Sequence, residues 1–316
     1  MRVLRAMPVS LVVAAVACGG GTAREEQSDK VGAGSDTTTL SVYVVNYPLA
    51  YMAQRIGGPD VTVSFPAPAD EDPAYWSPSP ETVAVYQGAD LILLNGADYA
   101  KWVAQASLPS AKLVDTGLAY TDRLIPLEEA VTHAHGPEGE HAHVGVAFTT
   151  WLDPALALEQ ARAITAAFEK ARPGQAAAFR ERLASLEADL MTIGTRLEEA
   201  TAAIDDHPLV FSHPVYQYLE RRYGLNGRSV HWEPDTEPSH REWSRFEKLL
   251  EEHPAEWMIW EAEPLASVAA RLEGLGVRSV VFDPCGNIPE QGDFASVMGA
   301  NLERLEAAWG AAAGGH

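Results

Sequence analysis

The stretch QAAAFRERLASLEADLMTIGTRLEEATAAI, residues 175–204, decides the fold. It is rich in helix-forming residues and follows Pro173-Gly174, which ends the helical pattern before it. Its apolar residues recur at spacings of three or four, which places them on one buried stripe of a helix: Phe179, Leu183, Leu186, Leu190, Ile193 and Leu197. At roughly 1.5 Å per residue, such a helix spans about 45 Å. A coiled-coil seam is the alternative, but the α/β context described next favours a rigid spine between two lobes.

Short β-forming runs alternate with helical patterns on both sides of this helix. The candidate strands are residues 40–46, 61–66, 89–95 and 112–115 in the first half, and 208–213, 228–231, 256–261 and 278–283 in the second. The helical patterns lie at 48–56, 79–87, 100–106, 215–223, 239–253, 265–275 and 294–309. Such alternation is typical of parallel sheets with helices on both faces. We predict an α/β fold of two lobes, each a four-stranded parallel sheet with flanking helices, joined by one long spine helix.

The predicted domain boundaries follow from this pattern. The N-terminal lobe covers residues 39–153, a helical linker that includes the spine covers 154–204, and the C-terminal lobe covers 205–316.

The N-terminus has the features of an export signal. Arg2 and Arg5 precede an apolar run that is too short to span a bilayer, and the small residues Ala15-Val16-Ala17 precede Cys18. This resembles the bacterial lipobox, in which the cysteine is acylated. We predict a signal peptide at 1–17, lipidation of Cys18, and a flexible polar tether at 18–38 that anchors the protein in the periplasm or cell envelope.

Composition excludes several classes of protein. With Cys18 lipidated, Cys285 is the other cysteine, so no internal disulfide can form. The net charge of -21 argues against binding to nucleic acid and to anionic membrane surfaces. The chain carries no Gly-x-Ser-x-Gly, phosphate-loop or His-Glu-x-x-His motif. We therefore expect a protein that is not an enzyme.

The strand ends of the second half gather metal-binding residue types. Ligands bind outside the carboxyl ends of strands in open parallel sheets. The second-half strand ends carry the candidate metal ligands His213, His231, Glu233, Glu261 and Asp283. Imidazole and carboxylate together suit zinc or manganese. Each residue alone could be a hydrogen-bonding histidine, a helix cap or a turn residue, but their conjunction favours a metal site.

A histidine-rich loop at 132–143 is a second candidate feature. His133, His135, His141 and His143 lie there among glycines and a proline. Tracts of this kind bind metal loosely, because neutral imidazoles can reach around one ion. The alternative is a solvated loop. We expect an auxiliary loop that gathers ions.

The chain is rich in tryptophan, and several lie near strand ends or candidate site loops: Trp76, Trp102, Trp151, Trp232 and Trp260. Most would be core residues. An aromatic-lined pocket for an organic ligand is the alternative.

From about residue 40 to 309, the chain resembles the zinc/manganese family of ABC-transporter solute-binding proteins. The resemblance is carried by NYPL at 46–49, DPAYWSPSP at 72–80, ADLILLNG at 89–96, WLDP at 151–154, SHPVYQYLERRYGL at 212–225 and Asp283-Pro284. The histidine-rich loop and the spine helix fall where zinc-type members carry theirs.

The resemblance implies a four-ligand metal site with two ligands from each lobe. His213 and Asp283 match the third and fourth ligands, whereas the two first-lobe histidines are replaced by Ala74 and Thr149. Alanine cannot bind a metal, and a threonine hydroxyl is a poor zinc ligand. Candidates to complete the site are His231, Glu233 and Glu261, the acidic run 70–72, and His141 or His143 from the loop.

These features predict an extracytoplasmic substrate-binding lipoprotein of an ABC importer. It would capture a divalent transition metal between its lobes, zinc first and manganese as the alternative, and deliver it to a permease of the inner membrane. We expect a monomer held at the membrane by its lipid. The alternative cargo on the same fold is a metal chelate or a small organic solute in an aromatic-lined cleft. Tyr75-Trp76 and Trp151 would pack against it, with His213, Glu261 and Asp283 as polar anchors. A surface adhesin is a third possibility that no motif supports.

Overall fold

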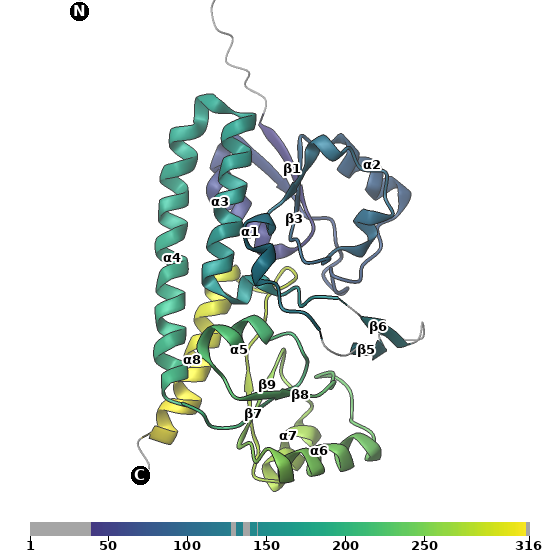
Figure 1. Ribbon diagram of the computed structural model, residues 1–316, viewed down its shortest axis with the longest axis vertical. Coiled ribbons are helices and arrows are strands. Elements are labelled where there is room, and N and C mark those ends of the chain that lie inside the picture. The colour runs from purple at the N-terminus through teal and green to yellow at the C-terminus, as the bar shows by residue number, and fades with distance from the viewer. Residues whose placement is uncertain (1–38, 128–130, 135–139, 144, 314–316) are drawn as a thin grey trace, which may run out of the picture. The chain divides into compact units, whose positions relative to one another are not determined.

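The first lobe is built on a four-stranded parallel sheet. The computed structural model describes residues 39–127, 131–134, 140–143 and 145–313 (Figure 1). The strands are β1 (Leu40–Val44), β2 (Val61–Ser64), β3 (Leu91–Leu94) and β4 (Leu113–Asp115), in the order β2-β1-β3-β4. All three strand pairs are parallel. This agrees with the predicted sheet of the first half.

A second parallel sheet forms the other lobe. Its strands are β7 (Leu209–Phe211), β8 (Gly227–Ser229), β9 (Trp257–Trp260) and β10 (Arg278–Val281), in the order β10-β9-β7-β8. Again each pair is parallel. Strands β7 and β9 are buried over their whole length, as expected for the centre of a sheet covered by helices on both faces. The predicted two-sheet α/β fold is confirmed.

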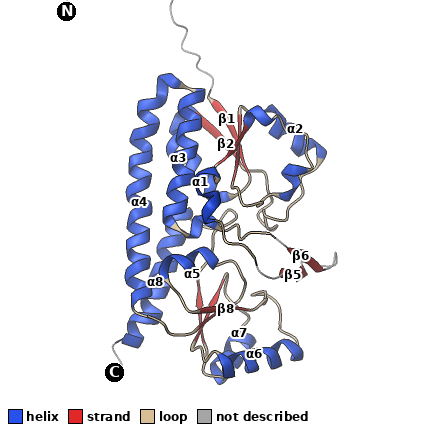
Figure 2. Ribbon diagram, viewed as in Figure 1, coloured by secondary structure: helices blue, strands red, loops and turns tan. Residues whose placement is uncertain are grey.

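The helices connect the strands and cover the sheets (Figure 2). They are α1 (Tyr47–Gly57), α2 (Pro80–Gly88), α3 (Pro154–Ala171), α4 (Ala176–Ala202), α5 (Gln217–Tyr223), α6 (His240–Glu252), α7 (Ala266–Gly274) and α8 (Phe294–Ala313). Short 3₁₀ helices lie at Gly58–Asp60, Lys101–Ala104, Ser110–Lys112, Leu118–Arg123, Thr150–Leu152 and Pro173–Gln175.

Local sequence explains where several helices begin. Side chains of Asn46, Ser79 and Asp153 accept hydrogen bonds from backbone N–H groups in the first turns of α1, α2 and α3. In each case a proline follows in the first turn, where its missing N–H costs nothing. Helix α6 begins with a capping box formed by Ser239 and Glu242.

Helix α4 is the predicted spine. Phe179, Leu186, Leu190 and Leu197 of the predicted stripe are buried, and Leu183 and Ile193 are partly buried. The helix packs on α3 of the linker, and it contacts α1 of the first lobe and α5 and α8 of the second. Ion pairs join it to both, at 2.9 Å for Arg182–Asp60, 2.6 Å for Arg55–Asp189 and 2.8 Å for Arg196–Glu306.

One hydrophobic core runs through both lobes. A single cluster of buried side chains includes Val42 of β1, Leu190 of α4 and Phe211 of β7. A smaller aromatic cluster beneath the second sheet contains Trp232, Trp243 and Trp260. Because the lobes share a core, we expect them to move little relative to each other.

Two segments differ from the sequence-based predictions. Part of the predicted loop at 132–143 forms a small antiparallel hairpin of β5 (Val131–Ala134) and β6 (Glu140–His143), a pairing that its histidine-rich composition does not signal. The predicted helix at 100–106 is a short 3₁₀ helix at Lys101–Ala104. Within the described ranges, no helix is both long and apolar enough to cross a membrane.

Candidate functional site

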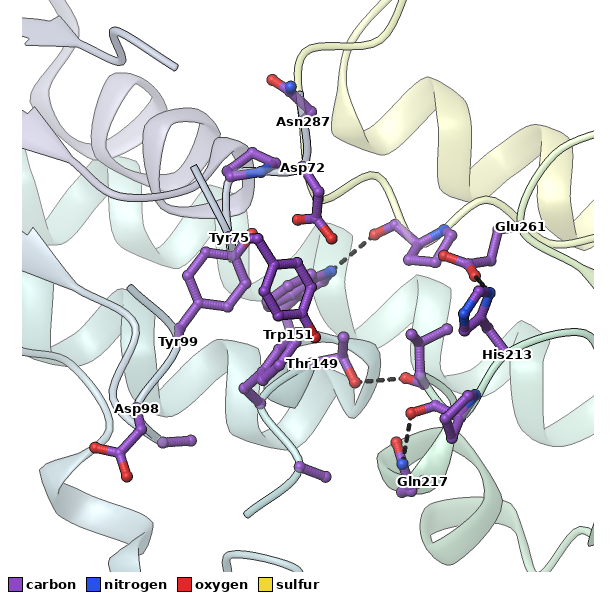
Figure 3. Close-up of a pocket in the computed structure, with 18 of the residues that line it drawn as sticks. Asp72, Tyr75, Asp98, Tyr99, Thr149, Trp151, His213, Gln217, Glu261 and Asn287 are labelled. Carbon is purple, nitrogen blue, oxygen red and sulfur yellow. Dashed lines mark hydrogen bonds and ion pairs between the residues drawn. The ribbon is translucent and has the colours of Figure 1, made fainter. Parts of the chain in front are cut away.

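A cleft of about 460 Å³ lies where the carboxyl ends of the strands of both sheets meet (Figure 3). Its first-lobe wall comes from segments 69–75, 97–101 and 145–151, and its second-lobe wall from 213–217, Glu233, Glu261 and 283–287. This is the position at which ligands bind in parallel α/β sheets. The cleft is therefore the candidate functional site.

His213 is the central polar residue of the second-lobe wall. It lies just after β7, separated from it by Ser212, and is only 6% exposed. Its Nδ1 lies 3.0 Å from Glu261 Oε1, and its Nε2 lies 3.6 Å from Glu233 Oε1. Figure 3 shows Glu261 directed at the imidazole ring. The closer carboxylate favours the tautomer with the proton on Nδ1, which directs the lone pair of Nε2 toward Glu233.

The carboxylates around His213 change its acidity. Burial alone would lower the pKa of the imidazole. The hydrogen bond and charge of Glu261, with the charges of Glu233 and Asp72, outweigh burial and raise the pKa above its ordinary value. The site therefore attracts positive charge.

Asp283 follows β10 on the same side of the cleft. Its Oδ1 accepts a hydrogen bond of 2.7 Å from the backbone N–H of Cys285. Asn301 of α8 holds the Asp283 backbone through bonds of 3.0 and 2.8 Å to its N–H and its carbonyl. Burial raises the pKa of the Asp283 carboxyl. A positive ligand beside it would offset this cost.

The structure gathers four of the five predicted second-lobe residues. His213, Glu233, Glu261 and Asp283 line the cleft. His231 is exposed and is not among the lining residues, although its ring centroid lies 5.8 Å from that of His213. Among the residues that the structure describes, no group of three or more His, Cys, Asp or Glu side chains is arranged to hold a metal ion.

The first-lobe wall offers different chemistry. Ala74 is buried, and its N–H donates a 2.8 Å hydrogen bond to Asp72 Oδ1. The hydroxyl of Thr149 donates a hydrogen bond to the Val215 carbonyl of the second lobe. Position 74 therefore offers only a methyl group, and the hydroxyl at position 149 already donates a hydrogen bond to the other lobe.

Four aromatic side chains belong to this wall: Tyr75, Tyr99, Phe148 and Trp151. Tyr75 is partly buried, and its ring packs against Phe148 with centroids 6.3 Å apart. The ring centroid of Tyr99 lies 5.2 Å from that of Phe148 and 5.7 Å from that of Trp151. Tyr99 and Trp151 are each 3% exposed, whereas Tyr75 and Phe148 are only partly buried and are the rings that a ligand would meet. Figure 3 shows the three labelled rings across the cleft from His213.

A left-handed turn explains how Tyr99 reaches the cleft. Gly96, Ala97 and Asp98 have φ values of 77°, 53° and 53°. A Cβ on Gly96 would lie 2.8 Å from Asp115 Oδ1, so the first turn position requires glycine. Non-glycine residues in this region store backbone strain, which occurs often at ligand sites.

Hydrogen bonds from the second-lobe segment 283–287 tie the two walls together. Trp151 Nε1 donates to the Pro284 carbonyl at 2.8 Å. Asn287 Nδ2 donates to the Pro68 and Glu71 carbonyls at 2.7 and 2.8 Å, which fixes the loop that carries Asp72.

Sequence reasoning identified Trp151 and Tyr75 but missed Tyr99 and Asn287. The left-handed turn is signalled only by Asn95-Gly96, and nothing in the sequence pattern indicates the role of Asn287.

The remaining predicted residues are those of the histidine-rich segment, Cys18 and four tryptophans, and the described ones among them do not line the cleft. On the β5–β6 hairpin, His133 is paired with His141, and Val131 with His143. His135 and Cys18 lie outside the described residues. Trp76, Trp102, Trp232 and Trp260 do not line the cleft, and the last three are core residues as expected.

The sequence of the chain is similar to those of known proteins. Residues 42–308 match the family described as "Zinc-uptake complex component A periplasmic". The chain is 26% identical over 295 residues to a high-affinity zinc uptake system protein of Bacillus subtilis, covering 88% of this chain and 90% of that protein. It is 24% identical to a manganese ABC transporter substrate-binding lipoprotein of Streptococcus pneumoniae, covering 73% and 71%.

Solved structures share the fold. A metal-dependent lipoprotein of Bacillus subtilis superposes with a TM-score of 0.72 at 21% identity, covering 85% of this chain and 98% of that one. The Zn(II)-bound ZnuA-like domain of Streptococcus pneumoniae AdcA gives 0.72 at 20% identity, covering 86% and 99%. Since the family match spans nearly the whole described region, the chain belongs to the zinc-uptake component A family of zinc/manganese ABC-transporter solute-binding proteins.

Proposed function

We propose that this protein is the extracytoplasmic solute-binding component of an ABC importer and that its cargo is a divalent transition metal, zinc first and manganese as the alternative. Metal capture takes place in the cleft between the lobes. Family membership and the named zinc and manganese relatives support the transport role. The family is one of transport proteins rather than enzymes.

The observation that carries the proposal is the geometry around His213. Two ligands at about 2.0–2.2 Å from a tetrahedral zinc ion lie roughly 3.3–3.6 Å apart. The 3.6 Å between His213 Nε2 and Glu233 Oε1 fits a cation held between these atoms. Glu261 then acts as the outer carboxylate that fixes the ring of His213. Asp283 supplies a further carboxylate from the same wall.

The predictions for the rest of the chain belong to the same proposal. A signal peptide at 1–17, lipidation at Cys18 and a tether at 18–38 would hold the lobes 39–153 and 205–316 and their linker 154–204 at the outer side of the membrane. The partners are the permease and the metal ion, and the protein acts as a monomer. His133, His135, His141 and His143 would gather ions near the cleft, and His231 would assist beside it.

Metal analysis tests the proposal. We expect the purified protein, loaded with zinc and dialysed at pH 7.5, to retain about one zinc per chain. His213→Gln should lose at least 90% of it, because the amide keeps a hydrogen bond to Glu261 but is a poor zinc ligand. His240→Ala, at an exposed position on α6, is the control and should retain the metal. Absence of stoichiometric metal from the unaltered protein would contradict the proposal.

A further inference from the structure

The cleft is larger than a metal ion needs. Ligand atoms about 2.0 Å from zinc enclose roughly 35 Å³. The cleft measures about 460 Å³, which lies within the range of about 300–1,000 Å³ that holds small organic molecules. Its size alone indicates room for an organic group beside the ion.

The two walls differ in the groups that they offer. His213, Glu233, Glu261 and Asp283 are cation ligands, and all belong to the second lobe. On the first-lobe side, the hydroxyl of Thr149 is bonded to Val215, and the lining includes the ring of Tyr75 beside the carboxylates of the loop 70–72. A metal held by the second lobe would therefore face a ring and not a second set of imidazoles.

Tyr75 is suited to contact a flat, positively charged ligand. Burial and the charges of Asp72, Glu261 and Glu233 raise the pKa of its phenol, so the ring stays neutral. Contacts with Phe148 hold the ring, with Tyr99 and Trp151 beneath. Stacking and cation–π contacts favour a flat, positively charged group on such a ring.

Charge limits which organic group can enter. The described lining residues include seven carboxylates and one lysine: Asp70, Glu71, Asp72, Asp98, Glu233, Glu261, Asp283 and Lys101. A chelator with a single negative charge leaves a divalent ion with a net charge of about +1. A chelator with three negative charges would reverse the sign of the complex, and the cleft would repel it.

We propose that the cleft takes its metal together with a small monoanionic chelator that carries a flat ring, with the ion against His213 and the ring against Tyr75. This inference rests on the proposed function. It assigns the first-lobe wall a binding role that replaces the two ligands lost at Ala74 and Thr149. The zinc complex of L-histidine is the probe, because histidine combines one negative charge, three donor atoms and a planar ring.

Retention of labelled histidine tests the inference. The purified protein would be mixed with radiolabelled L-histidine alone, with zinc, or with zinc and a tenfold excess of citrate, and separated by gel filtration. We expect one label per chain with zinc and none without it, and citrate should not replace histidine as a bound partner. Calorimetry should give a dissociation constant for the zinc–histidine complex at least tenfold below that for zinc alone.

Substitutions locate the organic group. In Tyr75→Ala, the dissociation constants for zinc alone and for the zinc–histidine complex should become nearly equal, because the lost contact is made only by the ring of the chelator. Tyr43→Ala is the matched control: Tyr43 is also partly buried and packed on an aromatic ring, yet lies outside the cleft. The ratio of its two dissociation constants should equal that of the unaltered protein.

The outcomes separate this inference from the proposed function. Retention of zinc without label, or removal of zinc by histidine, would overturn the chelator proposal and leave metal capture standing. An unchanged ratio in Tyr75→Ala would also overturn it. If the protein retained zinc in neither form, the proposed function itself would fail.

Discussion

At the scale of single residues, the cleft is defined by how a few side chains are held. His213 is fixed by Glu261 and faces Glu233, and Asp283 is fixed by its own turn. These residues could be predicted because they lie in the loops that begin at the carboxyl ends of strands, and these ends converge in a parallel sheet. Tyr99 and Asn287 could not, because a backbone turn and a contact between distant loops bring them to the cleft.

Glu220 of α5 gives a residue-scale prediction about stability. Its carboxylate lies against Gly227 of β8, and burial raises its pKa from 4.5 to about 7. The folded state therefore binds the proton more tightly than the unfolded state. Stability falls as pH rises from about 4.5 to about 7, and the loss is complete above that.

Glu220→Gln should remove this loss. We expect the free energy of unfolding to increase by about 3–4 kcal/mol at pH 8.5, because the pKa rises from 4.5 to about 7 and each pKa unit corresponds to about 1.4 kcal/mol. At pH 4.5 the gain should shrink to well under 1 kcal/mol. Urea unfolding at both pH values measures the difference, and an equal gain at both would refute the assignment.

At the scale of elements, hydrophobic patterning carries most of the predictive information. The stripe on residues 175–204 indicates α4 because a single face of that helix is buried against α1, α3 and α8. Most strands of the two sheets are recognisable because they are short, apolar and bounded by turns, whereas β8 has the polar sequence Gly-Arg-Ser. The β5–β6 hairpin is not, because its histidine-rich sequence lacks the alternation that marks a half-buried strand.

The spine gives an element-scale prediction with a neighbouring control. Leu190 is 3% exposed and belongs to the core that both lobes share, whereas the next residue, Met191, is 65% exposed. Leu190→Ala should lower the free energy of unfolding by about 2–5 kcal/mol, because it leaves a cavity. Met191→Ala should change it by less than about 0.5 kcal/mol. Chemical denaturation measures the free energy of unfolding of both variants. Equal losses would show that the buried stripe of α4 does not stabilise the protein more than its exposed face does.

At the scale of the whole molecule, one core and one spine join two sheets whose strand ends meet at the cleft. The sequence could predict this architecture because strand–helix alternation and a long helix are properties of the entire chain. The character of the first-lobe wall could be predicted only in part: the loss of histidine at positions 74 and 149 is visible in the sequence, but the aromatic surface opposite His213 arises from the packing of three separate loops.

Binding of a divalent metal in this cleft at His213 can be tested by the anomalous scattering of a zinc-loaded crystal. We expect one strong difference peak at the zinc absorption edge, about 2.0–2.1 Å from His213 Nε2 and within reach of the Glu233 carboxylate. A fully loaded crystal with no peak in the cleft, or with its peak elsewhere on the molecule, would show that the metal does not bind there.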